Sequence, residues 1–200
     1  MPELILASGS PYRRELLARL GLDFTVVSPD VDEHPEPAED GAALSRRLAL
    51  LKAGTVAARQ PGAIVIGSDQ VAECAGRQLG KPGTVERAVE QLGFCSGREV
   101  IFHTAVAVIG GQREQVRLVP TRVRMRNLSP ETIERYIRKD RPLDCAGAMK
   151  SEALGIALTE AITSDDPTAL VGLPLIALAE MLETAGLPIL GGLAQVRPSQ

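Results

Sequence analysis

The residues best placed to carry chemistry lie in the segment Gly67-Ser68-Asp69-Gln70, directly after the apolar run 63–66. Such a run predicts a buried strand, and a carboxylate at the C-terminal end of a buried strand commonly points into the crevice where ligands bind. Asp69 could there take a proton from a water molecule or bind Mg²⁺. An Asx turn that closes the strand is the competing interpretation of the same residue.

Two arginines, Arg13 and Arg14, lie in the first turn of a helix that we expect after Ser8-Gly9-Ser10-Pro11. The positive end of the helix dipole disfavours cations at this position. A bound anion, such as a phosphate chain, would compensate for them. A solvated basic helix end is the alternative. Arg14 fits that alternative better, because only one arginine of the pair need face a cleft.

Two lysines and an acidic pair extend this pattern. Lys52 projects from the edge of an apolar stripe on the predicted helix 42–59, where it either extends along apolar surface to solvent or enters a cleft. Lys81 lies in a rigid turn between a glycine and a proline, without the spacing of a Walker loop. Asp32 and Glu33 could supply a second oxygen ligand to a metal, although a solvated acidic loop is the stronger interpretation of that segment.

A scaffold of short strands and helices must position these side chains. Apolar runs predict strands at 4–7, 24–27, 63–66, 99–109, 115–125 and 155–159. Capping and periodicity predict helices that begin near residues 11, 42, 84, 130 and 174. Because strands and helices do not alternate strictly, the order favours an α/β or mixed α+β fold, with helices around an elongated mixed sheet, over a doubly wound parallel one. We expect one domain over 1–200, which could form two lobes around a cleft, with a loosely held tail at 187–200.

Composition narrows the function classes. Of the 200 residues, 44 % are hydrophobic, which is enough for a substantial core, and the net charge of −3 offers no basic surface for duplex nucleic acid. The odd number of cysteines and the absence of Cys-x-x-Cys or paired histidines argue against zinc and a disulfide framework. Cys145 fits a small buried hydrophobe, and Asp165-Asp166 a turn or a helix cap. With no signal-peptide pattern or membrane span, a cytoplasmic protein is expected.

Taken together, these segments resemble the Maf family of nucleoside triphosphate pyrophosphatases from Leu4 to about Leu182. The resemblance lies in the joint order of several short motifs: 4–14 (LILASGSPYRR), 31–33 (VDE), 52–53 (KA), 67–69 (GSD), 80–82 (GKP) and 172–174 (GLP). The pair Asp69-Gln70 and the segment 147–152 (GAMKSE) depart from the dTTP/UTP branch. They are similar to the branch assigned to 7-methyl-GTP, although that branch often carries tryptophan where this chain has Tyr12.

The resemblance implies a role for each candidate. Asp69 would be the proton acceptor, and a divalent cation, Mg²⁺ or Mn²⁺, would be held by Glu33 and Asp69. Specificity would rest on Tyr12, Gln70 and Glu152. Phosphates would be bound by Ser8, Arg13, Lys52 and Lys81. The physical interpretation agrees, because N7-methylguanine carries a delocalised positive charge that an aromatic face attracts, and its N–H edge suits a carboxylate. The resemblance also suggests a homodimer.

Two other functions stay open. One is the same pyrophosphatase chemistry on dTTP, UTP or another modified nucleotide. The other is a nucleotide-binding regulator of cell division that does not catalyse a reaction. The charged set at residues 13, 33, 52, 69 and 81 favours an enzyme, because a simple binding protein does not need a combined metal and water site.

Overall fold

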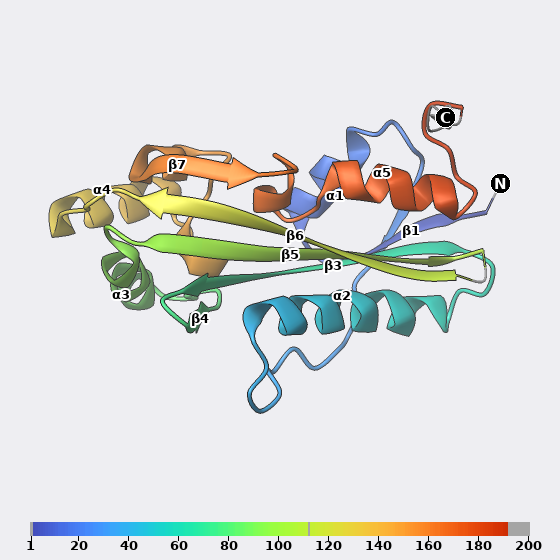
Figure 1. Cartoon of the computed structure of the whole chain (residues 1–200), viewed down its shortest axis with the longest axis horizontal. Coiled ribbons are helices and arrows are strands. Elements are labelled where there is room, and N and C mark those ends of the chain that lie inside the picture. The colour runs from blue at the N-terminus through green and yellow to red at the C-terminus, as the bar shows by residue number, and fades with distance from the viewer. Residues whose placement is uncertain (1, 112, 192–200) are drawn as a thin grey trace, which may run out of the picture.

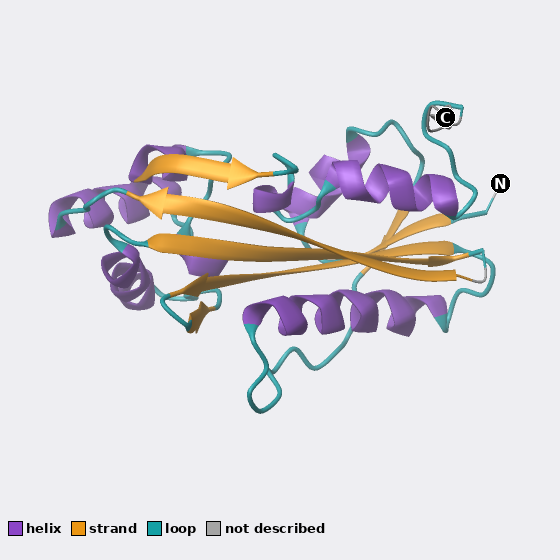
Figure 2. Cartoon of the chain, in the orientation of Figure 1, coloured by secondary structure: helices purple, strands orange, loops and turns teal. Residues whose placement is uncertain are grey.

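The computed structural model describes residues 2–111 and 113–191, and within them one mixed sheet with helices on both faces (Figures 1 and 2). The strands are β1 (Leu4–Ala7), β2 (Thr25–Val27), β3 (Ile64–Cys74), β4 (Arg77–Leu79), β5 (Glu99–Gly110), β6 (Arg113–Met125) and β7 (Thr159–Ser164). The helices are α1 (Pro11–Ala18), α2 (Gly41–Ala57), α3 (Val85–Cys95), α4 (Pro130–Asp140) and α5 (Leu175–Thr184). The predicted fold class is confirmed.

The sheet has the strand order β2-β1-β3-β5-β6-β7, and β4 pairs with β3. Strand β1 is parallel to both β2 and β3, whereas the other pairs are antiparallel. The predicted hairpin across Gly110-Gly111 joins β5 to β6. Three short 3-10 helices, 146–148, 154–158 and 169–171, lie in the connections of the C-terminal half.

The helices begin where the sequence predicts them to begin. Ser10 caps α1 by accepting a hydrogen bond from the Arg13 N–H, with Pro11 at the first helical position. Thr84 and Ser129 cap α3 and α4 in the same way. The expected turn at Asp166 is a remote cap as well, because its buried carboxylate accepts the Ile176 N–H at the start of α5.

Alternate residues of β1 and β3 face opposite sides of the sheet, as the period of a strand requires. Leu6 and Ile66 pack with α1 and α5 on one face, whereas Ile5 and Val65 pack against α2 on the other. Figure 1 shows α2 on the opposite side of the sheet from α1 and α5. A further core lies at the far end, around Phe102, where α3 and α4 pack.

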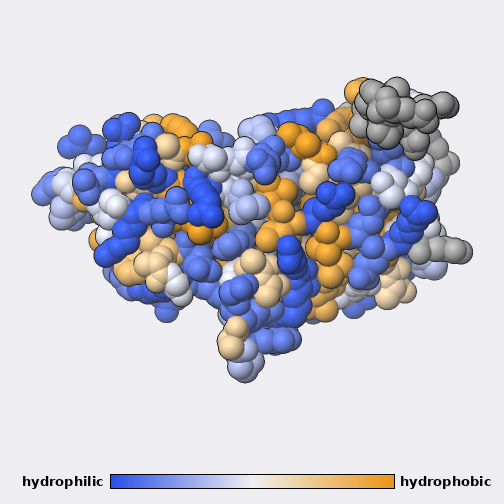
Figure 3. All heavy atoms as spheres, viewed as in Figure 1, coloured by the Kyte–Doolittle hydropathy of each residue, from blue (hydrophilic) through white to orange (hydrophobic). Residues whose placement is uncertain are grey.

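The face of the molecule seen in Figure 3 has a mixed surface. Figure 3 shows hydrophobic residues interspersed among hydrophilic ones on the visible face. Within residues 2–111 and 113–191, no helix is both long enough and apolar enough to cross a bilayer.

Two strand predictions were wrong. The strand predicted at 63–66 continues to Cys74, so Asp69 lies in the middle of β3, opposite Ala105 of β5, and not at its end. The polar run was mistaken for a strand end, because the groups that bind these side chains come from distant segments. Residues 154–158 form a 3-10 helix, and the strand follows it at 159–164.

Two further segments differ at least in part from the prediction. The short strand β4, which pairs antiparallel with β3, was not predicted. In the predicted tail, Leu187 is buried and its N–H donates to the Leu182 carbonyl, whereas 192–200 lie outside the described residues.

Candidate active site

A cleft of about 840 Å³ opens over the middle of β3, between the start of α1, one side of α2 and several loops. It brings together residues that are far apart in the sequence. All of the predicted site residues line it: Ser8, Tyr12, Arg13, Glu33, Lys52, Asp69, Gln70, Lys81 and Glu152. Arg14 is exposed and does not line the cleft, in agreement with its interpretation as a solvated residue.

The centre of the cleft is an ion-paired triad. The Lys52 Nζ lies 2.6 Å from Asp69 Oδ1 and 2.8 Å from Glu33 Oε1. Lys52 and Asp69 are only 5 % and 6 % exposed. The lysine therefore enters the cleft and does not extend to solvent. Of the two acidic residues 32 and 33, only Glu33 contacts Lys52. Asp32 accepts a hydrogen bond from the His34 N–H at 3.0 Å.

Gly67 allows α2 to approach β3 closely enough for this contact. A Cβ at position 67 would lie 2.2 Å from the Ala49 carbonyl oxygen and 2.7 Å from the Ala53 nitrogen. Both are backbone atoms of α2: Ala49 lies about one turn before Lys52, and Ala53 is the residue directly after it. The helix backbone thus occupies the space that any other residue at position 67 would need, and the lysine reaches Asp69 across this contact.

Arg13 is held by the loop before α5. Its Nε donates to the Gly172 carbonyl at 2.8 Å, and one terminal nitrogen donates to Ser8 Oγ at 3.4 Å. Burial lowers the pKa of the Arg13 guanidinium, while Asp69 and Glu33 act in the opposite direction. The group stays charged at neutral pH. These two bonds use two of its five N–H donors, so three remain for an anion in the cleft.

Ser68 and Gln70, which flank Asp69, fasten the same loop to β3. The Ser68 hydroxyl is buried 2.9 Å from the Gly172 carbonyl oxygen and 2.8 Å from the Ala105 carbonyl oxygen. The Gln70 amide nitrogen donates to the carbonyls at 169 and 170, both at 3.0 Å. Carbonyls only accept, so the amide orientation is settled, and its oxygen remains as an acceptor at the cleft.

Tyr12, from α1, contacts the segment 144–152 at one side of the cleft. The Tyr12 hydroxyl donates to Asp144 Oδ2 at 3.3 Å and accepts from the Cys145 thiol at 3.9 Å. Burial, followed by the charges of Cys145, Asp144 and Glu152, raises the pKa of Tyr12, so the ring stays neutral. Glu152 is exposed at the cleft edge, where it accepts a hydrogen bond from the Ser151 hydroxyl.

Cys145 differs from its expected role as a small buried hydrophobe. It is half-buried and lines the cleft. Burial, together with the charge of Asp144, raises the pKa of its thiol to about 12, which makes a thiolate nucleophile at neutral pH inaccessible. Cys145 therefore contributes surface and a weak hydrogen bond rather than reactivity.

The donor set of the cleft fits a divalent cation only in part. Within 2–111 and 113–191, no cluster of three or more histidine, cysteine or acidic side chains could hold a metal by itself. Glu33 and Asp69 nevertheless converge on one point, the Lys52 ammonium. Mg²⁺ is commonly bound by one or two carboxylates, with water and substrate phosphates completing the octahedron. The two carboxylates suit that arrangement.

Sequence reasoning missed the roles of Ser68 and Gly172, although both stand in motifs that it had singled out. The Gly172 carbonyl accepts from Arg13 and lies within hydrogen-bond distance of the Ser68 hydroxyl. Gly172 has φ = 119°, a conformation that favours glycine. The glycine before Leu173-Pro174 was the signal in the sequence that could have pointed to this loop, since glycine is common where a turn needs a positive φ.

Known proteins of one family are similar to this chain over most of its length. A model of the family described as "Maf-like protein" matches residues 3–185. The 7-methyl-GTP pyrophosphatase of Xanthomonas axonopodis pv. citri is 58 % identical over 189 residues, which are 94 % of this chain and 100 % of that protein. The protein of the same name from Bordetella pertussis is 55 % identical over 191 residues, 96 % of each chain.

Among solved structures, the Ham1 protein of Staphylococcus aureus aligns with a TM-score of 0.46 and 18 % identity, over 62 % of this chain and 72 % of that one. The family model, in contrast, spans most of the chain, and the two relatives are more than half identical to it. The chain therefore belongs to the Maf family.

Proposed function

We propose that this chain is a nucleoside triphosphate pyrophosphatase that hydrolyses 7-methyl-GTP to 7-methyl-GMP and pyrophosphate. The observation that carries the proposal is the cleft itself, in which a buried carboxylate, Asp69, lies among Arg13, Lys52 and Lys81. Relatives that are 55–58 % identical over nearly their whole length carry the name 7-methyl-GTP pyrophosphatase. The enzyme would remove modified nucleotides from the cytoplasmic pool.

The reaction needs a positioned water and neutralised phosphates. Arg13, Lys52, Lys81 and the Ser8 hydroxyl would bind the triphosphate, a role that suits guanidinium and ammonium groups. Asp69 would orient a water molecule and accept its proton as the oxygen attacks the α-phosphorus. The bond from the α-phosphorus to the bridging oxygen breaks, and pyrophosphate leaves. Most of the rate should come from positioning and charge stabilisation.

A divalent cation, Mg²⁺ or Mn²⁺, is part of the proposal. Glu33 and Asp69 would hold it together with phosphate oxygens, and when bound it would lower the pKa of water and neutralise phosphate charge. Removing divalent ions with a chelator should abolish pyrophosphate release, and adding Mg²⁺ should restore it. Full activity in the chelator would contradict this part of the proposal and leave the assignment of Asp69 standing.

The base that the cleft can recognise depends on which hydrogen-bonding groups of its lining side chains have no partner within the protein. The Gln70 amide nitrogen is committed to the loop at 169–170, so its oxygen is what it can offer a ligand. Glu152 is also an acceptor. Two acceptors suit the N1–H and exocyclic amine of guanine, whereas uracil and thymine present carbonyl oxygens on both sides of one N–H. Tyr12 would add an aromatic face, which attracts the cationic methylated base by about 0.5–2 kcal/mol.

The decisive experiment is pyrophosphate release from canonical and N7-methylated triphosphates. Asp69→Asn should lower kcat by about 10³-fold or more while nucleotide binding survives. Near-normal turnover of Asp69→Asn would contradict the assignment of the base. Preference for a pyrimidine triphosphate would contradict the proposed roles of Glu152 and Gln70 in base recognition. The proposed pyrophosphatase reaction would then stand, with a different base as its substrate.

A matched arginine pair tests phosphate binding. Arg13→Gln should lower kcat/KM by about 10²-fold, because it removes a charged, partly buried phosphate ligand. Arg14→Gln changes the same charge one residue away, outside the cleft, and should stay within about twofold. Equal effects at both positions would mean that net charge alone matters. A regulator without catalysis would bind nucleotide and release no pyrophosphate in any variant.

A further inference from the structure

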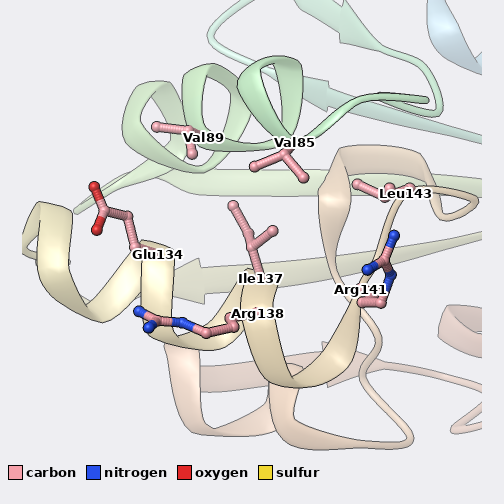
Figure 4. A pocket seen from close by; sticks show the side chains of 7 residues that line it. All are labelled: Val85, Val89, Glu134, Ile137, Arg138, Arg141 and Leu143. Atoms are coloured by element: carbon pink, nitrogen blue, oxygen red, sulfur yellow. The ribbon is translucent and has the colours of Figure 1, made fainter.

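A second cavity, of about 330 Å³, lies between α3 and α4 and shares no lining residue with the catalytic cleft. Its apolar wall consists of Val85 and Val89 from α3, Ile137 from α4, and Leu143 from the loop that follows (Figure 4). Val85 is 46 % exposed, so its side chain is open to a ligand from solvent. The volume suits a small organic molecule and is too small for a helix or a strand of a partner.

The charged residues at this cavity are Arg138, Arg141 and Glu134. Within the described residues, neither arginine side chain has an ion-pair or hydrogen-bond partner. Figure 4 shows Arg141 beside Leu143 at one end of the cavity, whereas Glu134 and Arg138 lie toward the other. The Arg141 end is therefore the place for an anionic group, and the valines and Ile137 would receive an apolar body.

The backbone at Arg141 is a second, independent observation. Arg141 is the C-cap of α4, with φ = 45° and ψ = 59°. Glycine or asparagine is the usual residue in this left-handed conformation. A non-glycine residue held there is strained, and such strain gathers at functional sites. Arg141, which is held in this conformation, lies at one end of the apolar cavity.

The cavity is connected to the catalytic cleft through two loops. The Gly83 N–H donates to the Leu143 carbonyl at 3.0 Å. Lys81, two residues before Gly83, lines the cleft, and so does Asp144, the residue after Leu143. A ligand that displaces Leu143 would therefore move a proposed phosphate ligand and the partner of the Tyr12 hydroxyl together.

We propose that this cavity is a regulatory site for a small amphipathic anion, with an apolar body against Val85, Val89 and Ile137 and a single carboxylate, sulfonate or phosphate on Arg141. Occupancy changes the catalytic cleft through the Gly83–Leu143 contact. The binding half of the proposal is independent of the proposed function, whereas the regulatory half rests on it.

The test uses 8-anilinonaphthalene-1-sulfonate, which joins apolar rings to one sulfonate and fluoresces when bound. Arg141→Gly should weaken its Kd by about tenfold or more and leave the melting temperature unchanged or higher, since glycine relieves the strained backbone. Arg141→Lys retains the charge and should stay within about threefold. Lys139→Gln, a matched loss of charge on α4 outside the cavity, should stay within about twofold.

A filled cavity provides the second variant. Val85→Phe should abolish binding at the site because the ring occupies the apolar space. Equal affinity in the intact chain and in Arg141→Gly or Val85→Phe would overturn the site. Saturating probe should change KM or kcat of the intact chain by at least about twofold and leave Arg141→Gly unaffected. Unchanged turnover would overturn the regulatory coupling. Fluorescence needs no turnover, so a failure of the proposed function would be recognised separately.

Discussion

Replacing Gly67 with alanine tests whether the contact between α2 and β3 sets the position of the ion pair between Lys52 and Asp69. The new methyl carbon would lie 2.2 Å from the Ala49 carbonyl oxygen, where 3.4 Å is an ordinary contact. Both partners are backbone atoms, so no side chain can rotate out of the way. The helix and the strand must therefore separate locally by about 1 Å.

That separation has a stability cost and a catalytic cost. Overpacking of a rigid core contact destabilises a protein by about 1–3 kcal/mol, and the upper end applies here because backbone opposes backbone. At about 2–4 °C per kcal/mol for a chain of this size, the melting temperature should fall by about 6–12 °C. Lys52 moves with α2, and a 1 Å displacement of a positioning group can cost about 10²-fold in rate.

The assay pairs thermal unfolding with pyrophosphate release, and the chain offers a matched control on the facing helix. Gly54 lies in α2, where a Cβ would meet only Ile109 Cδ1 at an ordinary 3.9 Å. Gly54→Ala should raise stability by about 0.5–1 kcal/mol through helix propensity and leave activity unchanged.

The two substitutions therefore have opposite predicted signs. If Gly67→Ala kept both the melting temperature and kcat/KM of the unaltered chain, the close helix–strand contact would not be what positions Lys52.

Two other perturbations probe the same site, and a third probes the ion pair of Glu39 and Arg47 outside the cleft. Ser68→Ala should lower the free energy of unfolding by about 1–2 kcal/mol in thermal unfolding, because the Gly172 carbonyl loses its contact with the Ser68 hydroxyl. It should lower kcat/KM by about tenfold in kinetic assays, because the Gly172 carbonyl, which accepts from Arg13, is then held less firmly. Lys52→Met should lower kcat/KM by about 10²-fold or more, since two carboxylates lose their shared cation. Hydrogen bonds from Arg47 lower the pKa of Glu39 from 4.5 to about 2, so its contribution to stability is present above pH 4.5 and lost as the pH falls toward 2. The melting curves of Glu39→Gln and the unaltered chain should converge over that range.

The parts of the fold that follow from local signals could be predicted from the sequence. Ser10 and Pro11 define the start of α1 because a cap needs only neighbouring N–H groups. The β5–β6 hairpin follows from two long apolar runs that flank Gly110-Gly111. Residue type and position indicate five of the site residues, Arg13, Glu33, Lys52, Asp69 and Lys81, and the resemblance adds Ser8, Tyr12, Gln70 and Glu152. The structure brings all nine together in the cleft.

What local signals could not give is the set of long-range partners. The sequence predicts that Asp69 lies at a strand end, because a serine, an aspartate and a glutamine in succession interrupt the apolar pattern. The strand continues because each of these side chains finds a partner elsewhere: Lys52 from α2, and carbonyl groups from the segment at 169–172. No periodicity within residues 63–70 reports a partner about a hundred positions away.

The long antiparallel strands restrict how a substrate can enter. On β5, Phe102 belongs to the core between α3 and α4, whereas Val108 belongs to the core under α1 and α5. Hinge bending between the two ends would have to break backbone hydrogen bonds along the uninterrupted β5–β6 ladder. Entry and product exit should therefore depend on the loops at 28–35, 80–83 and 144–152. If loop opening limits turnover, solvent viscosity and loop proline substitutions should slow the enzyme more than changes in leaving-group chemistry.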